Sequence, residues 1–340
     1  MKIIDQLLIS DEPSVKYRTR ILLLKENPDS ANNLKLREEI RNSSRVRKLL
    51  SHRNPSGKSA PYDKPYHKWF GAHWVLVHLA ELFYPAGDKS LFPLRDQVYD
   101  IWLSDYMLNS EDCTDKKSAY GTVAVPVING RYRRCASQQG NALFATLTLR
   151  IEDERSETLK NLLLKWQWPD GGWNCDKNPD ARKSSFTESL IPLRALAYCL
   201  KKCHEGKVKN AVKNAAEIFL GRNLFKKIRD GKIINPEFLK LHYPCYWHYD
   251  ILFGLKVMAE AGFIKDSRCS EALDILESKR LKSGGWKTGS KYYKISKYDG
   301  FKPELNFERV DWSSKQKSDF NEWITTDALY VLSESGRIKI

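Results

Sequence analysis

The organisation of this chain can be read outward from the segment Leu163-Leu-Lys-Trp-Gln167-Trp-Pro-Asp-Gly171-Gly-Trp173-Asn-Cys-Asp176, which ends an amphipathic run with tryptophans and glycines. Leu163 and Gln167 lie on neighbouring turns of one helix, and Gly171 allows the backbone to leave that helix with a positive φ. Trp173 can then fold back onto the helix, while the Gln167 side chain bonds loop backbone groups that would otherwise be unpaired. The segment therefore predicts the closed end of a helical unit.

Two other segments repeat this spacing. Leu276-x3-Arg280-x3-Gly284-Gly-Trp286 carries arginine in place of glutamine, and Leu49-x3-Arg53-x3-Gly57 is a weaker copy with Ser59 in place of the tryptophan. The three glycines are 114 and 113 residues apart, and half of this interval is about one helical hairpin. The chain of 340 residues would then hold about six hairpins.

These residues carry a resemblance to known proteins. The spacing of Gln167, Gly171 and Trp173 resembles the QW repeat of squalene and oxidosqualene cyclases, and the whole chain resembles the superfamily of terpenoid cyclases and protein prenyltransferases. Over roughly residues 10–335 it is similar to bacterial prenyltransferase/squalene-oxidase repeat proteins, through the segments 166–176, Cys135-Ala-Ser-Gln-Gln-Gly-Asn141 and Tyr246-Trp-His-Tyr-Asp250. The resemblance implies an all-α fold, an α/α toroid of about six hairpins, with a central cavity for an apolar, isoprenoid-like ligand.

The hydrophobic pattern agrees with rings of inner and outer helices in a single domain over residues 1–340. Residues 69–83 are apolar on nearly every face, as an inner helix must be, whereas residues 93–107 have a polar face. The expected inner helices continue at 138–150, 184–201, 247–261 and 322–333, and the outer helices at 153–166, 208–220 and 267–279. Residues 121–128 read as a loop or short hairpin, and the aromatic, lysine-rich residues 287–320 as a candidate lid.

The composition indicates where in the cell the protein is expected and which partners it could bind. No run of 18 apolar residues appears, and the chain begins without a signal-peptide pattern, so we expect a cytoplasmic protein with no transmembrane segment. Seven cysteines in such a chain indicate reduced thiols. The chain has a net charge of +15, and its lysine and arginine residues cluster at 201–232 and 279–302. Such clusters are typical of a solvated outer surface. Nucleic acid is an alternative partner that we do not favour, because no recognition motif accompanies the charge.

In a toroid, polar residues at the first turns of the inner helices meet at one mouth although they are distant in sequence. We therefore examined these helix starts for catalytic and binding residues. The candidates are Cys135, Gln138, Asn141, Glu188, Trp247, His248, Tyr249, Asp250 and Trp323.

The first hypothesis is a zinc site formed by Cys135, Cys175 and His248 at the mouth. Two thiolates and one imidazole suit zinc, and three protein ligands leave one position for water or substrate. Protein prenyltransferases bind zinc with an aspartate, a cysteine and a histidine, and their histidine lies on an inner helix that ends in Gly-Leu. His248 followed by Gly254-Leu255 is similar, but the Asp-x-Cys order is absent, since Asp176 follows Cys175 directly. The alternative is a pair of uncoordinated thiols.

The second hypothesis is acid-initiated terpene cyclisation. Protonation of an alkene needs a carboxylic acid held protonated in an apolar cavity, with aromatic rings that shield the carbocation. The candidates for catalysis are Asp250, Glu188 and His248, and those for substrate binding are Trp247, Tyr249, Trp323, Gln138 and Asn141. The Asp-x-Asp-Asp run of class II cyclases is absent. The alternative is that both carboxylates cap helices or serve structural hydrogen bonds.

The predicted function is that of a prenyltransferase-like or terpene-cyclase-like toroid, which binds an isoprenoid-like substrate and, if it is an enzyme, transforms it with or without zinc. A squalene-type cyclase has two toroid-like domains and a protein prenyltransferase needs a second subunit, so one toroid departs from both. The alternative is a non-catalytic module that binds a peptide, a lipid or nucleic acid through its basic rim.

Overall fold

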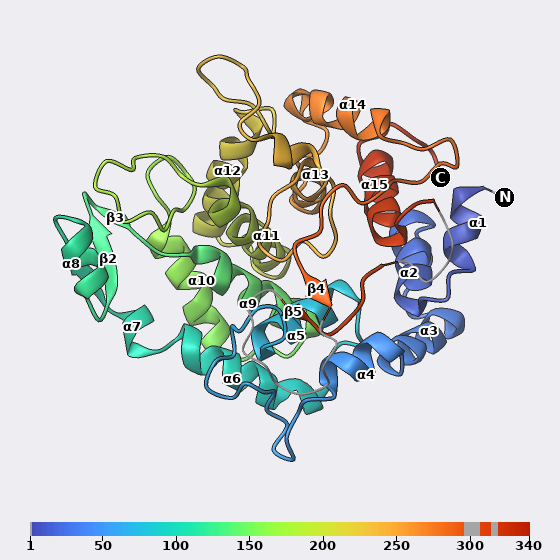
Figure 1. Ribbon diagram of the computed structural model, residues 1–340, viewed down its shortest axis with the longest axis horizontal. Helices are drawn as coiled ribbons and strands as arrows, with labels where there is room; N and C mark the ends of the chain where they lie inside the picture. Colours follow the sequence, from blue (N-terminus) through green and yellow to red (C-terminus); the bar gives the residue numbers. More distant parts are fainter. Residues whose placement is uncertain (1, 296–306, 314–318) are drawn as a thin grey trace.

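The protein is described by a computed structural model in which residues 2–295, 307–313 and 319–340 are placed (Figure 1). Six helices form an inner ring: α2 (Pro13–Arg18), α5 (Ala72–Glu81), α9 (Ala136–Leu149), α11 (Phe186–Lys202), α13 (Ile251–Glu260) and α15 (Glu322–Glu334). The outer helices are α1 (Ile3–Leu8), α3 (Ala31–Arg41), α4 (Ser44–Leu50), α6 (Phe92–Trp102), α10 (Arg155–Trp166), α12 (Gly206–Leu220) and α14 (Ser270–Ser278). The chain is all-α, and inner and outer helices alternate along it.

The inner helices pack in a closed ring. Helix α9 packs against α5 and α11, α13 packs against α11 and α15, and α15 packs against α2. The ring closes between α2 and α5, where Ser14 Oγ donates to the carbonyl of Leu82 at 2.7 Å. Both chain ends consequently lie on the same side of the molecule (Figure 1). This is the arrangement expected for an α/α toroid.

Burial separates the two rings. Nine of the ten residues of α5 are buried, against three of the nine in α14, because an inner helix has neighbours on both sides. Close approach within the inner ring needs a small residue at one point. A Cβ at Gly140 of α9 would lie 2.9 Å from the backbone nitrogen of Pro192 in α11, so glycine is required there.

The motif that begins at Leu163 folds as its spacing predicts. Gln167 Nε2 donates to the carbonyls of Gly171 at 2.7 Å and Ala211 at 2.9 Å, and Trp173 Nε1 donates to the carbonyl of Leu163 at 2.9 Å. Gly171 has a φ of 99°. The tryptophan thus closes back onto α10, and the glutamine joins this hairpin end to α12.

The second copy of the motif repeats these contacts. Arg280 Nε donates to the carbonyl of Gly284 at 3.2 Å, and Trp286 Nε1 donates to the carbonyl of Leu276 at 2.7 Å. Gly284 and Gly57 also have positive φ values, 93° and 82°. The repeat read from the sequence is therefore a repeat of backbone geometry.

Short elements fill the remaining described regions. Helices α7 (Asp105–Leu108) and α8 (Lys116–Gly121) flank a small sheet in which β2 (Val125–Ile128) lies between parallel β1 (Ser110–Asp112) and antiparallel β3 (Arg131–Tyr132). The short hairpin expected near residues 121–128 is present as β2 and β3. Strands β4 (Lys294–Ile295) and β5 (Phe307–Glu308) pair in parallel, and the rest of the expected lid, 296–306 and 314–318, lies outside the described residues.

The interior of the ring holds charged side chains. Arg194 on α11 pairs with Glu260 on α13 at 2.6 Å and with Glu81 on α5. Lys256 on α13 lies 3.1 Å from Glu81 and 3.3 Å from Asp327, which also pairs with Arg18. Helices α5 and α13 are not neighbours in the ring, so the contact between Lys256 and Glu81 crosses its interior.

This ion-pair network corrects one expectation from the sequence. We expected a central cavity for an apolar ligand, but charged groups of five inner helices occupy the interior at this level. Helices α2, α5, α11 and α15 each contribute one charged residue to the network and α13 contributes two, a pattern that looks like ordinary amphipathicity when one helix is read alone. An apolar ligand inside the ring would therefore have to lie above the network, toward the first turns of the inner helices.

Candidate functional site

Two cysteines and one glutamate from separate segments meet at the end of the ring where α9 and α11 begin. Cys135 is the N-cap residue of α9, Glu188 lies in the first turn of α11, and Cys175 lies in the loop between α10 and α11. One potential ligand atom of each residue lies within 4.8 Å of the other two. Glu188 Oε1 is 3.8 Å from Cys175 Sγ, and Glu188 Oε2 accepts a hydrogen bond from the Ser137 backbone amide at 3.2 Å.

The loop that carries Cys175 is held by two neighbours. Ser189 Oγ on α11 accepts a hydrogen bond from the Trp173 backbone amide at 2.9 Å. Arg133, just before α9, donates to the carbonyls of Asp176 at 3.1 Å and Ala181 at 2.9 Å. These bonds join the loop to the helices that carry Cys135 and Glu188, so the three side chains are positioned before any ligand binds.

Mutual contact and burial disfavour negative charge in this cluster. The hydrogen bond with Cys175, followed by burial and the nearby Glu188, raises the pKa of Cys135. Burial also raises the pKa of Glu188, against the opposing effect of its bond with Ser137. Removing three protons from these groups without a cation would place like charges together at low dielectric. A divalent cation would remove this cost.

Arg134 brings a positive charge to the same cluster. Burial lowers the pKa of its guanidinium, while Cys135 and Glu188 act in the opposite direction. The guanidinium donates to Gln138 Oε1 and lies 5.6 Å from the ring of Trp102. Arg134 is thus available to balance an anionic group at the mouth.

Aromatic side chains form a wall beside the cluster. The ring of Tyr66 lies 5.1 Å from that of His73 and 5.3 Å from that of Trp102. Trp102 Nε1 donates to His73 Nδ1 at 3.1 Å, and burial lowers the pKa of His73 to about 3. Burial raises the pKa of Tyr66, partly opposed by its hydrogen bond with Gln138. These rings carry no charge at pH 7, but His73 and Trp102 are buried, so the half-buried Tyr66 ring is the part of this wall that can contact an apolar ligand.

Only two of the three residues predicted to bind zinc lie together. Cys135 and Cys175 do come together, but Glu188 takes the place expected for His248. The ring of His248 is stacked between Trp247 at 4.0 Å and Tyr292 at 3.8 Å, and burial lowers its pKa to about 3. The expected inner helix 247–261 begins only at Ile251, so His248 lies in the preceding turn rather than on the helix.

Asp250 is used as a helix cap. Its Oδ1 accepts from the Phe253 amide at 2.7 Å, and its Oδ2 accepts from the His242 amide at 2.8 Å. His242 Nδ1 also lies 2.7 Å from Oδ2, and the Asp250 side chain is 1% exposed. The carboxylate that we expected as a catalytic acid therefore has the capping role that was its structural alternative.

Two of the expected substrate-binding aromatics belong to the core. Tyr249 donates through its hydroxyl to the carbonyl of Leu224 at 2.6 Å and packs on Phe186. Trp323 is 1% exposed and stacks on Tyr243 at 4.9 Å. Neither is placed to contact a ligand. Both were chosen because they lie at helix starts, but the first turn of a buried helix also points side chains into the core.

The other expected binding residues differ in their exposure. Gln138 is half-buried beside Arg134 and Tyr66, at the edge of the Cys135, Cys175 and Glu188 cluster. Trp247 is half-buried and lies 5.0 Å from the Lys68 ammonium, so it is part of the surface around His248. Asn141 is buried within α9. Tyr66 and Arg134 were not selected from the sequence, because neither belongs to an inner helix.

Comparison with known proteins gives distant structural likeness. No family model and no curated protein matches the sequence. A solved protein from Actinoplanes is 15% identical with a TM-score of 0.45, and the match covers 96% of this chain and 90% of that one. The type II terpene cyclase MstE from Scytonema is 12% identical with a TM-score of 0.29, over 88% of this chain and 98% of its own.

A variant of the Scytonema enzyme in complex with its substrate, geranylgeranyl dihydroxybenzoate, is 13% identical with a TM-score of 0.27 and covers 89% of this chain and 98% of its own. In the part of this chain that the structure describes, no helix is both long and apolar enough to cross a membrane. The packing of the inner helices described above defines the ring. The cluster of Cys135, Cys175 and Glu188 is its candidate functional site.

Proposed function

We propose that this protein binds zinc through Cys135, Cys175 and Glu188 and acts as a zinc-dependent enzyme on an isoprenoid-like substrate at the mouth of the ring. The observation that carries the proposal is the approach of these three ligand atoms to within 4.8 Å from three separate segments. Zinc accepts sulfur and carboxylate ligands, and three protein ligands leave one coordination position open.

The charges of the cluster agree with a divalent cation. Two thiolates and one carboxylate carry three negative charges, which zinc and the Arg134 guanidinium together would neutralise. Bound zinc would supply a Lewis acid and lower the pKa of a thiol or water bound to it. Arg134 could bind an anionic group of the substrate, and Gln138 orients both Arg134 and the Tyr66 hydroxyl by hydrogen bonding.

The ion-pair network and the aromatic rings beside the cluster together indicate where the apolar part of the substrate would bind. The ion-pair network fills the ring below, where Lys256 contacts Glu81 across the interior. The rings of Tyr66, His73 and Trp102 lie beside the cluster and carry no charge at pH 7. A hydrocarbon chain would therefore lie across the mouth against the half-buried Tyr66 ring, which the buried His73 and Trp102 support, rather than thread the ring of helices.

The proposal is tested by zinc content and turnover. We expect about one zinc per chain in the purified protein, measured by mass spectrometry, and its loss in Cys135→Ser, Cys175→Ser and Glu188→Gln. Cys203→Ser is the matched control, because this half-buried thiol lies at the other end of α11. Consumption of isoprenoid diphosphates should disappear with the zinc. An apoprotein that takes up no zinc from solution, or equal zinc in all variants, would refute the site.

A second candidate function rests on Glu188 alone. Burial raises the pKa of this carboxyl, which keeps the proton that a general acid must carry before it protonates an alkene. In that reaction Glu188→Gln would abolish turnover, whereas Cys135→Ser and Cys175→Ser would keep most of it. The three variants proposed above therefore also separate acid-initiated cyclisation from zinc-dependent chemistry.

A further inference from the structure

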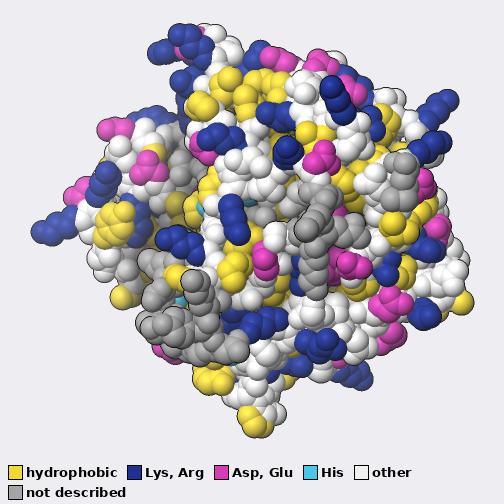
Figure 2. All heavy atoms as spheres, turned by 45° about the vertical axis from the view of Figure 1, so that its right-hand side comes forward, with side chains coloured by type: hydrophobic (Ala, Val, Ile, Leu, Met, Phe, Trp, Pro, Cys, Tyr) yellow, Lys and Arg dark blue, Asp and Glu magenta, His cyan; other side chains and the backbone are white. Residues whose placement is uncertain are grey.

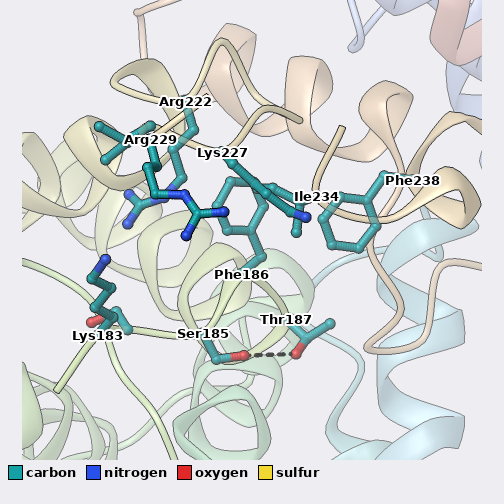
Figure 3. Close-up of a pocket in the computed structure, with 11 residues that line it drawn as sticks. Lys183, Ser185, Phe186, Thr187, Arg222, Lys227, Arg229, Ile234 and Phe238 are labelled. Atoms are coloured by element: carbon teal, nitrogen blue, oxygen red, sulfur yellow. Dashed lines mark hydrogen bonds between the residues drawn. The ribbon is translucent and has the colours of Figure 1, made fainter. Parts of the chain in front are cut away.

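A cavity lies apart from the cysteine cluster, between the first turn of α11 and the segment that follows α12 (Figure 3). Its volume is about 550 Å³. Residues 183–187 form one wall and residues from Arg222 to Phe238 form the other. Glu188 does not line this cavity, although it follows Thr187 directly.

The charged side chains that line this cavity are all positive. They are Lys183, Arg222, Lys227 and Arg229. Figure 3 shows that the last three come from the segment above the Phe186 ring, while Lys183 approaches from the opposite wall. Elsewhere lysine and arginine are spread over the visible face and interleaved with acidic groups (Figure 2). A cavity that gathers four cations without a lining carboxylate therefore favours an anionic ligand.

The environment of Arg222 also favours an anionic ligand, because its guanidinium is half-buried without an ion pair among the described residues. Burial lowers the pKa of this guanidinium. The charge of Asp170 opposes this fall in pKa, but the Asp170 carboxylate is bound to the amide and hydroxyl of Ser184 at 2.8 and 2.6 Å. The hydrogen bond from Arg222 to the carbonyl of Ile218 at 2.8 Å leaves other guanidinium donors available.

The first turn of α11 adds neutral donors to the same wall. Ser185 is the N-cap residue of this 17-residue helix, but its side chain does not cap the helix and instead lies 3.0 Å from the Thr187 hydroxyl. The first backbone amides of α11 thus have no side-chain partner at the cap. Such amides, together with the helix dipole, favour a phosphate group beside the four cations.

The rest of the lining is apolar. The rings of Phe186 and Phe238 stack at 5.6 Å, and Ile234 lies beside them. Ile228, on the same loop as Lys227 and Arg229, is 67% exposed. A ligand that carried only a phosphate would use the basic wall and leave this surface uncovered.

We propose that this cavity binds a phosphate group carried on an apolar chain. The phosphate lies among Arg222, Lys227, Arg229 and Lys183, and the chain lies against Phe186, Ile234 and Phe238. Two sources share this chemistry: a soluble phosphorylated amphiphile and the headgroup of an anionic phospholipid. The site needs neither zinc nor the thiols, so it stands independently of the proposed enzymatic function.

Calorimetric titration with dodecyl phosphate below its micellar concentration tests the site. We expect saturable binding to one site that weakens at high salt, with weaker binding of inorganic phosphate. The double variant Lys227→Gln/Arg229→Gln, whose side chains are exposed, should raise the Kd at least about tenfold. Arg47→Gln, an exposed arginine on α4, is the matched control and should leave the Kd unchanged. Equal affinity in the wild type, the double variant and Arg222→Gln would overturn the proposal.

Two further variants test which residues contact the apolar chain and whether the cavity is independent of the cysteine cluster. Phe238→Ala should weaken dodecyl phosphate and leave inorganic phosphate unaffected, whereas an equal loss for both would refute the role of the apolar wall. Cys175→Ser should bind dodecyl phosphate as the wild type does, whatever the zinc measurement gives.

Vesicle sedimentation separates the two sources. Binding to phosphatidylcholine vesicles that contain phosphatidic acid, lost in Ile228→Ser and in the double variant, would identify a bilayer headgroup. Binding of dodecyl phosphate without vesicle binding would identify a soluble amphiphile. Either result supports the proposal. It would be overturned if the double variant still bound the vesicles and its Kd for dodecyl phosphate were unchanged.

Discussion

The sulfur of Cys175 lies 3.8 Å from Oε1 of Glu188, although the two residues belong to different segments and neither is a sequence neighbour of Cys135. Trp173 explains the approach, because its indole bonds back to α10 and its backbone amide bonds to Ser189 on α11. The motif that closes the hairpin thus also delivers a thiol to the start of the next inner helix.

This geometry separates two possible zinc sites. Replacement of Glu188 by glutamine should weaken zinc binding at least about tenfold, because it removes an anionic ligand. Replacement of His248 by alanine should leave the affinity unchanged, since this ring is stacked between Trp247 and Tyr292. Competition with a chromogenic chelator measures both. The opposite order of effects would restore the histidine to the site.

Stability should depend on pH through His73. Burial lowers its pKa to about 3, so the unfolded chain, in which the histidine has an ordinary pKa, binds this proton more readily than the folded one. Stability is therefore present above about pH 6.5 and is lost as the pH falls toward 3, at about 1 kcal/mol per pH unit near pH 5.5. Urea unfolding at pH 7, 6 and 5 should show a smaller loss in His73→Gln, whose amide oxygen can still accept from Trp102. Parallel curves for the two proteins would contradict this.

The ion-pair network should be costly to break. Arg194→Met leaves Glu81 and Glu260 inside the ring without their partner, and loss of one member of a buried pair costs about 3–5 kcal/mol. Arg337→Met is the control, because Arg337 also bonds two carboxylates, Asp274 and Glu277, but does so at the surface. Its cost should stay within about 1 kcal/mol. Similar unfolding free energies for both variants would show that the network is not isolated from solvent.

The glycine of the hairpin motif should not tolerate a side chain. Gly171 has a φ of 99°, and a Cβ there would lie 2.4 Å from the carbonyl oxygen of Asn214. We expect Gly171→Ala to lower the free energy of unfolding by about 1–3 kcal/mol and to disturb the loop that carries Cys175. Gly206→Ala is the control, because Gly206 has no atom near its Cβ position and an ordinary φ. Thermal unfolding of the two variants gives the comparison, and equal melting temperatures would show that the backbone relaxes.

Much of the fold could be predicted from the sequence because the relevant signals are local. The spacing of Leu163, Gln167, Gly171 and Trp173 specifies a helix end, a positive φ and two hydrogen bonds, all within one short segment. The apolar runs identify the inner helices in the same way. Boundaries were less certain: residues 247–250 were expected in a helix, but Asp250 ends the preceding turn as the N-cap of α13.

The site could be predicted only in part, because its members meet through packing. Cys135 and Cys175 are predicted to lie together because the sequence places both near the mouth of the ring. The choice between His248 and Glu188 depended on the rotation of α11 and on the turn before α13, which no local pattern encodes. Likewise, Tyr66 and Arg134 reach the cluster from segments outside the inner helices.

By itself, the sequence determined the helical units and their repeat, since backbone preference and hydrophobic periodicity act over a few residues. Only the tertiary structure decided that Glu188 joins the two thiols, that Asp250 caps a helix, and that Arg194, Lys256, Glu81 and Asp327 fill the interior of the ring. Those outcomes depend on which side chains face one another across the closed ring, and that is settled when all six inner helices pack together.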